Sequence, residues 1–268
     1  MSAINKKLLF TEMRRLSLEA GRAIMVIYKS DDFEVNTKSD ESPVTIADVT
    51  ADKIIYNGLH KSFPDVAIVT EEQSDTHTNN TSTFLIVDPL DGTKEFIHRR
   101  GDFTVNIAYV ENGIPVMGVV YAPAKNRLFI TDMSGKSFEE MAPFDDNVVG
   151  ELKPIHVNTP DLNKLIVVAS KSHRDQATDD YINKYNVEDM RSAGSSLKFC
   201  LVATGEADLY PRLGRTMEWD TAAGQAVLQG AGGKVVRFDN HEPLTYGKNI
   251  FENPFFIAYA PGIVLQNA

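Results

Sequence analysis

Cysteine is almost absent from this sequence of 268 residues, in which Cys200 stands alone. A single cysteine excludes an intrachain disulfide, and chains without disulfides are typical of a reducing compartment. No run approaches the roughly 18 apolar residues of a membrane span, and we expect no secretory signal peptide. The sequence therefore predicts a cytoplasmic protein, and it leaves peripheral association with the inner face of the membrane open.

Positive charge is also scarce. Lys and Arg number 27 against 37 Asp and Glu, which gives a formal net charge of −10. This balance argues against a nucleic-acid coat or a protein that binds anionic membranes, because both need a basic surface. A small anionic substrate remains compatible if cations gather locally. We expect a small-molecule substrate and no nucleic-acid partner, and we favour a monomer.

Several familiar motifs are missing or incomplete. The six histidines show no paired spacing, so we expect no zinc site. The Gly-Lys-Ser at 135–137 lacks the earlier glycine of a phosphate-binding loop, because Ile130 stands at that position. The glycines at 230–233 follow an expected helix and are typical of a helix end. Cys200 lies on an apolar helix stripe, which predicts a buried small side chain.

Apolar residues recur at three- and four-residue steps early in the chain, the pattern of a helix that packs on one face. This spacing predicts helices over residues 9–27 and 47–59. Short apolar runs follow, and they predict strands over 66–69, 84–87, 103–110 and 116–121. The turn-like segment 123–126 indicates a hairpin between 119–121 and 128–130.

The stretch 133–160 is rich in Gly, Pro, Asp, Asn and Ser, which makes it the best candidate for a boundary. We expect an N-terminal α+β half over 1–155 and a C-terminal α/β half over 156–268. The second half alternates, with strands expected at 165–169, 187–191, 207–210, 234–238 and 256–259, and helices at 175–185, 196–204 and 221–228. This mixture predicts a layered mixed α/β fold, with antiparallel strands more prominent early.

The most informative motif is Asp-Pro-Leu-Asp-Gly-Thr at 88–93, directly after an apolar run. Pro89 lacks an N–H group and ends the strand ladder. Asp88 and Asp91 can then converge, with the Leu90 carbonyl between them. Hard oxygen atoms of this kind are the ligands that Mg²⁺ takes.

The end of the same motif has the features of a phosphate cradle. Gly92 lets the backbone approach a ligand closely, and a helix or turn that begins at Thr93 would offer free amide groups to a phosphate. On its own, however, Asp-Pro-x-Asp-Gly is also an ordinary turn sequence. A metal and phosphate site becomes the better explanation only if other acidic residues join it.

Three further acidic positions shift the balance toward a site. Glu71 follows an expected strand, Asp48 lies at the start of the second helix, and Asp220 directly follows the only tryptophan, Trp219. Each has a simpler explanation, because Glu71 and Glu72 could form a solvated charge pair and the two aspartates could be helix caps. A carboxylate beside Trp219, however, needs a polar partner.

Together, the segments Thr-Glu-Glu at 70–72, 88–93 and Trp-Asp-Thr-Ala-Ala-Gly at 219–224 resemble the inositol monophosphatase superfamily, which are Mg²⁺-dependent, lithium-sensitive phosphatases. The resemblance covers nearly the whole chain. It implies a five-layered αβαβα sandwich and two or three Mg²⁺ ions in the site. One departure is that Thr70 stands where many members have glycine, which leaves the following carboxylate in place.

The resemblance also implies a role for each matched position. Asp48 and Thr93 would position and deprotonate the attacking water, without a covalent phosphoenzyme. The amides of Gly92 and Thr93 would hold the scissile phosphate. The implied metal ligands are Glu71, Asp88, Asp91, Asp220 and the Leu90 carbonyl. Of these, the groups that would also border the substrate are Glu71, Leu90, Asp91 and Asp220.

Residues 194–203, Gly-Ser-Ser-Leu-Lys-Phe-Cys-Leu-Val-Ala, and Leu-Tyr-Pro-Arg at 209–212 are similar to the CysQ branch of that superfamily, the 3′(2′),5′-bisphosphate nucleotidases. The implied reaction converts adenosine 3′,5′-bisphosphate and water into AMP and phosphate. The sulfated nucleotide made in sulfate activation would be a second substrate, linked to sulfur assimilation. The residues implied to hold the 5′-phosphate or the nucleotide are His173, Ser195, Lys198 and Arg212.

Other functions remain open at this point. Taken alone, Lys198 and Arg212 have a simpler interpretation as solvated surface charges. The helix at 196–204 would leave Lys198 off its buried stripe, which consists of Leu197, Cys200, Leu201 and Thr204. An inositol or sugar phosphatase of the same superfamily would depend little on these cations. A non-catalytic sensor that binds the nucleotide with Mg²⁺ is a third hypothesis, although it would not need the water-activating pair.

Overall fold

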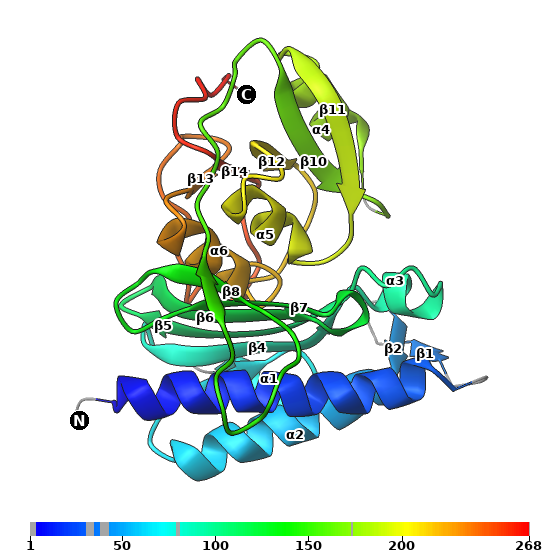
Figure 1. Ribbon diagram of the computed structural model, residues 1–268, viewed down its shortest axis with the longest axis vertical. Coiled ribbons are helices and arrows are strands. Elements are labelled where there is room, and N and C mark those ends of the chain that lie inside the picture. The colour runs from blue at the N-terminus through cyan, green and yellow to red at the C-terminus, as the bar shows by residue number, and fades with distance from the viewer. Residues whose placement is uncertain (1–3, 31–34, 38–42, 79–80, 173, 268) are drawn as a thin grey trace.

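The computed structural model describes residues 4–30, 35–37, 43–78, 81–172 and 174–267. Within these ranges the chain forms two large β-sheets separated and flanked by helices (Figure 1). His173, implied above as a contact of the nucleotide, lies outside the described residues. Among the described residues, no helix is both long and apolar enough to cross a membrane.

The first layer consists of two helices, α1 (Lys6–Tyr28) and α2 (Ile46–Ser62), which pack against each other beneath the larger sheet (Figure 1). Both were predicted from the spacing of apolar residues. The Asn5 side chain caps α1 by accepting a hydrogen bond from Leu8 N at 3.1 Å. Apolar residues of both helices, such as Leu16 and Ile55, are fully buried in one core cluster with strand residues such as Val87.

The second layer is a seven-stranded sheet in the order β3-β4-β5-β6-β7-β8-β9. Only the pair β3–β4 is parallel, and the other neighbours are antiparallel. The predicted hairpin is confirmed as β6 and β7 joined by the 3₁₀ turn Pro123–Lys125. The strands are β3 (Ile68–Thr70), β4 (Phe84–Asp91), β5 (Thr104–Glu111), β6 (Ile114–Ala122), β7 (Arg127–Thr131), β8 (Ser137–Glu140) and β9 (Leu152–Pro154).

The middle layer is formed by helices α5 (Leu197–Ala203) and α6 (Ala222–Gly230), which lie between the two sheets (Figure 1). One core cluster joins them to both sheets and includes Phe129 of β7, Phe199 of α5 and Phe256 of the second sheet. A helix enclosed on both sides is covered nearly all round, which explains the apolar composition of both segments.

The fourth layer is a five-stranded sheet in the order β11-β10-β12-β14-β13. Its strands are β10 (Leu165–Ser170), β11 (Val187–Ala193), β12 (Leu209–Arg212), β13 (Lys234–Arg237) and β14 (Phe256–Tyr259). Strand β10 is parallel to β11 and β12, and β14 is antiparallel to β12 and β13. Helix α4 (Gln176–Ile182) covers the outer face through Tyr181 and Ile182. The predicted αβαβα sandwich is therefore confirmed.

Several elements had no clear signal in the sequence. They are β1 (Val35–Thr37), β2 (Pro43–Thr45), the 3₁₀ turn η1 (Ser74–Thr78), β8 and β9. The helix or turn considered at Thr93 is present as the short helix α3 (Thr93–Ile97). Strands β8 and β9 lie within 133–160, so part of this polar stretch belongs to the larger sheet. The strands of the larger sheet come from 68–154 and those of the smaller from 165–259. The division at residue 155 stays a prediction.

Candidate active site

Two acidic segments meet where strands β3 and β4 end. The strands are parallel, and the Glu71 N–H donates to the Val87 carbonyl at 3.1 Å. Glu71 therefore comes level with Asp88. The register of β4 against β5 shifts between Asp88 and Asp91, as expected where Pro89 has no N–H to donate. Past the shift, Asp91 accepts hydrogen bonds from Asn106 of β5 and from Ser196.

Three carboxylates from three segments converge at this edge. One oxygen each of Glu71, Asp88 and Asp220 lie within 4.8 Å of one another. Burial, together with the charges of Asp91 and Glu71, raises the pKa of Asp220 well above its usual range. Burial also raises the pKa of Asp91 to about 6. Crowded carboxylates of this kind are the oxygen donors that divalent cations take. The donor set therefore fits a divalent metal.

The turn that follows Asp88 contributes backbone groups to the same site as the acidic cluster. The Leu90 N–H donates to Asp88 Oδ1 at 3.1 Å, which orients that carboxylate. Gly92 has φ +93°, which would strain any residue with a side chain, and a Cβ atom there would also lie only 3.1 Å from the Asp102 carbonyl oxygen. Helix α3 begins at Thr93, and the first amides of a helix have no acceptor within it.

Asp48 and Thr93 form a hydrogen-bonded pair. The Thr93 hydroxyl donates to Asp48 Oδ1 at 3.0 Å. The other oxygen, Oδ2, accepts from the Thr45 N–H at 2.7 Å and the Thr45 hydroxyl at 2.6 Å, within the capping box of α2. Asp48 is 1% exposed, and burial raises its pKa. The carboxylate is thus a helix-capping group and a partner of Thr93 at the same time.

A single pocket of about 1010 Å³ gathers the expected residues. Its size lies at the upper end of the range for small-molecule sites. Asp48 stands behind Thr93 and does not line the pocket. The expected residues that do are Glu71, Asp88, Leu90, Asp91, Gly92, Thr93, Ser195, Lys198, Arg212 and Asp220.

Lys198 and Arg212 are buried cations on the wall of this pocket. Their exposed fractions are 5% and 8%, so the interpretation as solvated surface charges is wrong. The Lys198 Nζ donates to the Ser195 carbonyl at 2.6 Å and lies 5.3 Å from the centre of the Tyr210 ring. The Arg212 Nη2 donates to the Arg215 carbonyl at 3.0 Å. Both cations are therefore held by backbone carbonyls within the pocket wall.

The buried stripe expected on α5 is wrong in part. Leu197 and Cys200 are buried as predicted, but Leu201 and Thr204 are partly exposed. Lys198, predicted to lie off the stripe, is buried. The reason is that α5 is enclosed between two sheets, so its covered surface is wider than one stripe. Burial raises the pKa of Cys200, as expected for an inert thiol.

The loop before α5 is tightly built. Ser195 has φ +51°, a left-handed conformation that is uncommon for a residue with a side chain. A Cβ atom on Gly194 would lie 2.5 Å from the Asp102 carbonyl oxygen, so the loop packs closely against that backbone. These contacts fix the Ser195 carbonyl that accepts from Lys198.

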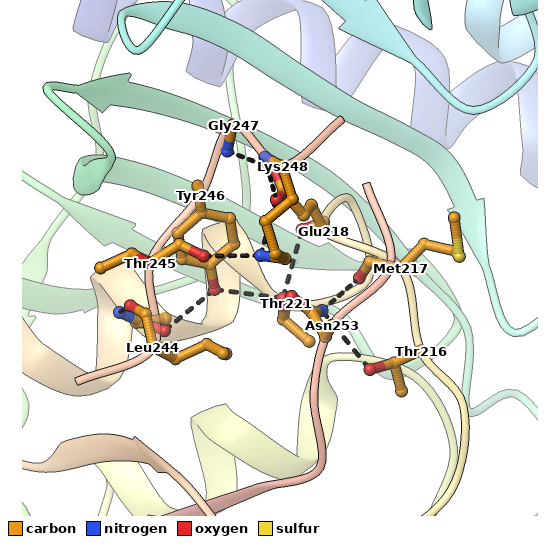
Figure 2. A network of polar contacts seen from close by, with 11 residues as sticks. Thr216, Met217, Glu218, Thr221, Leu244, Thr245, Tyr246, Gly247, Lys248 and Asn253 are labelled. Atoms are coloured by element: carbon orange, nitrogen blue, oxygen red, sulfur yellow. Dashed lines mark hydrogen bonds and ion pairs between the residues drawn. The ribbon is translucent and has the colours of Figure 1, made fainter. Parts of the chain in front are cut away.

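Asp220 lies in a short loop, and Figure 2 shows hydrogen bonds of its neighbours Met217, Glu218 and Thr221. The Met217 N–H donates to Asp220 Oδ2 at 2.8 Å. The Asn253 side chain donates to the Met217 carbonyl at 2.7 Å and to the Thr221 hydroxyl at 3.0 Å, as Figure 2 shows. Asn253 therefore holds the chain both before and after Asp220. The Tyr246 hydroxyl adds a bond to Thr221 Oγ1 at 3.1 Å.

Glu218 anchors the same loop from inside the protein. Its carboxylate is fully buried and accepts from the Gly247 N–H at 2.8 Å and the Lys248 N–H at 2.9 Å (Figure 2). The Lys248 ammonium lies 2.6 Å from the same side chain. A buried carboxylate with three charge-assisted partners is strongly held.

We expect Glu218→Ala to lower the free energy of unfolding by about 2–4 kcal/mol, because the partly exposed Lys248 ammonium and two backbone amides lose their buried acceptor. The matched control is Glu252→Ala, which removes an exposed carboxylate that pairs with Arg215 at 3.2 Å. This substitution should change the free energy of unfolding by less than about 1 kcal/mol. Urea denaturation measures both. Equal effects of the two substitutions would contradict the role of Glu218.

Comparison with known proteins agrees with this geometry. The family model described as "Inositol monophosphatase family" matches residues 5–257. The chain belongs to the inositol monophosphatase family. Chains of known structure also match: the CysQ protein of Bacteroides thetaiotaomicron, titled a bacterial member of that family, is 37% identical with a TM-score of 0.81 and covers 96% of this chain and 98% of its own.

Curated relatives carry a more specific name. The Escherichia coli K12 protein named 3′(2′),5′-bisphosphate nucleotidase CysQ is 43% identical over 246 residues, covering 90% of this chain and 96% of its own. The protein of the same name from Haemophilus influenzae is 30% identical over 264 residues, covering 96% and 94%. The resemblance to the CysQ branch of the inositol monophosphatase family is confirmed, and the chain is an enzyme of this family.

Sequence reasoning overlooked several groups around the site. Tyr210 lies beneath Lys198, and Glu218 anchors the loop of Asp220. Asn106 donates to Asp91 Oδ2 at 3.2 Å. A signal existed for Asn106, because a polar side chain in the middle of an apolar strand is unusual. Nothing in the sequence pattern identified Tyr210 or Glu218.

Proposed function

We propose that the protein is an Mg²⁺-dependent phosphatase that hydrolyses the 3′-phosphate of adenosine 3′,5′-bisphosphate to AMP and phosphate. The observation that carries this proposal is one pocket with an acidic cluster and two buried cations, Lys198 and Arg212. The acidic cluster suits metal ions that would bind one phosphate group, and the two cations suit a second phosphate group. The name of the curated relatives supports the same substrate.

The second phosphate would lie against Ser195, Lys198 and Arg212. A buried arginine and a buried lysine supply fixed, charge-assisted donors that a phosphate dianion can accept. An inositol monophosphate has one phosphate, and once that phosphate lies at the acidic cluster the substrate has no second anion to offer Lys198 and Arg212. The cations therefore favour a bisphosphate over a simple monoester.

The metals would be held by the convergent oxygen atoms at the ends of β3 and β4 and before α6. Bound Mg²⁺ would neutralise the phosphate, lower the pKa of a water molecule and align the attacking and leaving oxygens. The residues proposed as ligands are Glu71, Asp88, Asp91, Asp220 and the carbonyl of Leu90. These groups would also form the floor beneath the scissile phosphate.

The attacking water would be oriented by the chain's own hydrogen bonds. The Thr93 hydroxyl donates to Asp48 and so keeps its lone pairs for a proton of the water. As that proton moves to Thr93 Oγ, the hydroxyl proton can pass to Asp48. Burial raises the pKa of Asp48, which makes it a better proton acceptor. The amides of Gly92 and Thr93 would hold the phosphate oxygens during in-line attack.

The same site suits one further substrate. The sulfated nucleotide made in sulfate activation carries the same 3′-phosphate and an anionic 5′ group, which Lys198 and Arg212 could also bind. We include it in the proposal, together with a place in sulfur assimilation and nucleotide recycling. Lithium sensitivity is proposed on the family resemblance.

Lys198 gives the proposal a pH signature. Burial lowers its pKa to about 8, so the ammonium loses its charge as pH rises through that value. We therefore expect kcat/KM for the bisphosphate to fall above about pH 8. In Lys198→Arg the cation stays protonated, and the fall should move upward by more than about one pH unit. The charged groups that face Lys198 are Asp91, Glu95, Arg212 and Asp220.

Initial rates from about pH 6.5 to 9.5, for wild type and Lys198→Arg, measure this effect. The comparison uses the position of the decline and not the absolute rate, so a slower variant still gives an answer. The same decline in both proteins would assign it to another group and contradict the role of Lys198.

Product analysis tests the proposed reaction itself. Adenosine 3′,5′-bisphosphate is incubated with the protein and MgCl₂, and the nucleotides are separated by chromatography. We expect AMP with a free 3′-hydroxyl as the only nucleotide product. Adenosine 3′-phosphate as the product would reverse the assignment of the two phosphate positions, and no product would overturn the proposal.

A further inference from the structure

A buried asparagine on β5 links two of the proposed metal ligands. Asn106 is 1% exposed, and its Nδ2 donates to Asp91 Oδ2 at 3.2 Å and to the Ser196 hydroxyl at 3.0 Å. The Ser196 N–H donates to the same Asp91 oxygen at 2.6 Å, and its hydroxyl donates to the Asp220 carbonyl at 2.5 Å. The larger sheet and the middle helical layer are joined at this point.

The two donors determine how Asp91 is presented. Because Oδ2 accepts from both the Ser196 N–H and the Asn106 amide, the carboxylate cannot rotate without losing both bonds. Its other oxygen, Oδ1, is then the one that would bind a metal ion. The bond from Ser196 to the Asp220 carbonyl fixes the backbone of a second ligand relative to the first. A rigid ligand pair costs less to organise when a cation binds.

We propose that Asn106 and Ser196 are positioning residues that set the affinity of the acidic cluster for a divalent metal. The inference rests on the proposed function only for the assignment of Asp91 and Asp220 as ligands. Neither residue lines the pocket, so the effect passes through the two aspartates. Loss of a hydrogen-bond partner behind a metal ligand typically weakens metal binding by about 10–100-fold.

Thr104 offers a matched control on the same strand. It lies two residues before Asn106, so both side chains point to the same face of β5. Thr104 is fully buried and is paired in register with Asp91. Its hydroxyl has no hydrogen-bond partner in the part of the chain that the structure describes. Thr104→Val therefore changes a buried polar group beside Asp91 without removing a bond to it.

The experiment titrates the protein with MgCl₂ alone, without nucleotide, in an isothermal calorimeter. We expect Asn106→Ala to weaken the Kd for Mg²⁺ by about 10–100-fold, and Thr104→Val to leave it unchanged. Thermal denaturation in EDTA and in MgCl₂ gives a second measurement. The rise in Tm caused by Mg²⁺ should shrink in Asn106→Ala, whereas a merely structural role would lower Tm equally in both solutions.

Ser196→Ala covers the case in which Asn106→Ala does not fold. It removes the hydroxyl but keeps the backbone donor to Asp91, so we expect a weakening at the lower end of the same range, about 10-fold. A folded Asn106→Ala with wild-type affinity, or Ser196→Ala with wild-type affinity when Asn106→Ala is unfolded, would overturn the inference. A wild-type protein that binds Mg²⁺ but releases no phosphate from the bisphosphate would contradict the proposed function alone.

Discussion

Asp91→Asn should lower kcat for adenosine 3′,5′-bisphosphate by at least about 10³-fold at saturating Mg²⁺. The substitution keeps the shape of the side chain and removes the charge. A lost charged ligand forfeits about 4 kcal/mol of transition-state stabilisation, which corresponds to that factor in rate. Phosphate release at raised enzyme concentration measures the residual activity. A variant with near-normal turnover would refute the assignment of Asp91 as a ligand.

The same variant should stay folded. Burial raises the pKa of Asp91 from 3.8 to about 6, so in the metal-free protein the ionised carboxylate opposes folding at neutral pH. The ionised carboxylate lowers the free energy of unfolding by its full amount above about pH 6. The effect disappears as pH falls below about 4, because the unfolded chain then also binds the proton. Without metal at about pH 8, Asp91→Asn should therefore be at least as stable as wild type.

Thermal denaturation in EDTA at several pH values checks this expectation. The difference in Tm between variant and wild type should close as the solution is acidified. An inactive variant that is also much less stable than wild type at neutral pH would attribute the loss of activity to unfolding. The ligand assignment would then lose its support.

Arg212→Ala should raise KM for the bisphosphate by about 10²-fold, because a buried guanidinium that meets a phosphate dianion contributes about 3 kcal/mol. The effect on kcat should be far smaller, since the proposed contact is to the phosphate that does not react. The matched control is Arg237→Ala, an exposed arginine paired with Asp239 at 2.5 Å, which should leave KM unchanged.

The outcome for Arg212→Ala separates the competing functions. An unchanged KM would favour an inositol or sugar phosphatase of the same family, since such an enzyme has no second phosphate to hold. A wild-type protein that binds the bisphosphate in calorimetry and releases no phosphate would favour a nucleotide sensor. The hydrogen-bonded pair Asp48 and Thr93 argues against the sensor, because binding alone does not require it.

Much of the fold was predictable because its elements carry clear apolar patterns. Helices α1 and α2 follow the spacing of one buried face, and strands β4 to β7 are apolar runs that are buried almost throughout. The structure has these elements within a few residues of the predicted ranges. Strands β8 and β9 were missed because they alternate poorly and carry polar residues toward the edge of the sheet. They are held instead by distant contacts such as the buried Arg14–Glu140 pair at 2.6 Å.

From the residue pattern alone, the candidate site was predictable only where it is local in sequence, and the family resemblance supplied its distant members. The motif at 88–93 places its groups through a proline and a glycine, whose backbone preferences are visible in the sequence. The burial of Lys198 was not, because it depends on a sheet and a helix layer that close around α5. The link from Asn106 to Ser196 and the anchor at Glu218 join residues far apart in the chain. Local patterns contain no information on such contacts.

The most direct test of the proposed function compares initial rates of phosphate release from adenosine 3′,5′-bisphosphate and from inositol 1-phosphate. Each is measured with Mg²⁺, with and without Li⁺. We predict that kcat/KM is larger for the bisphosphate by at least about 10²-fold, the factor expected from the buried cations, and that Li⁺ inhibits its hydrolysis. Preference for the inositol ester would contradict the substrate assignment, and release from neither would contradict the assignment as a phosphatase.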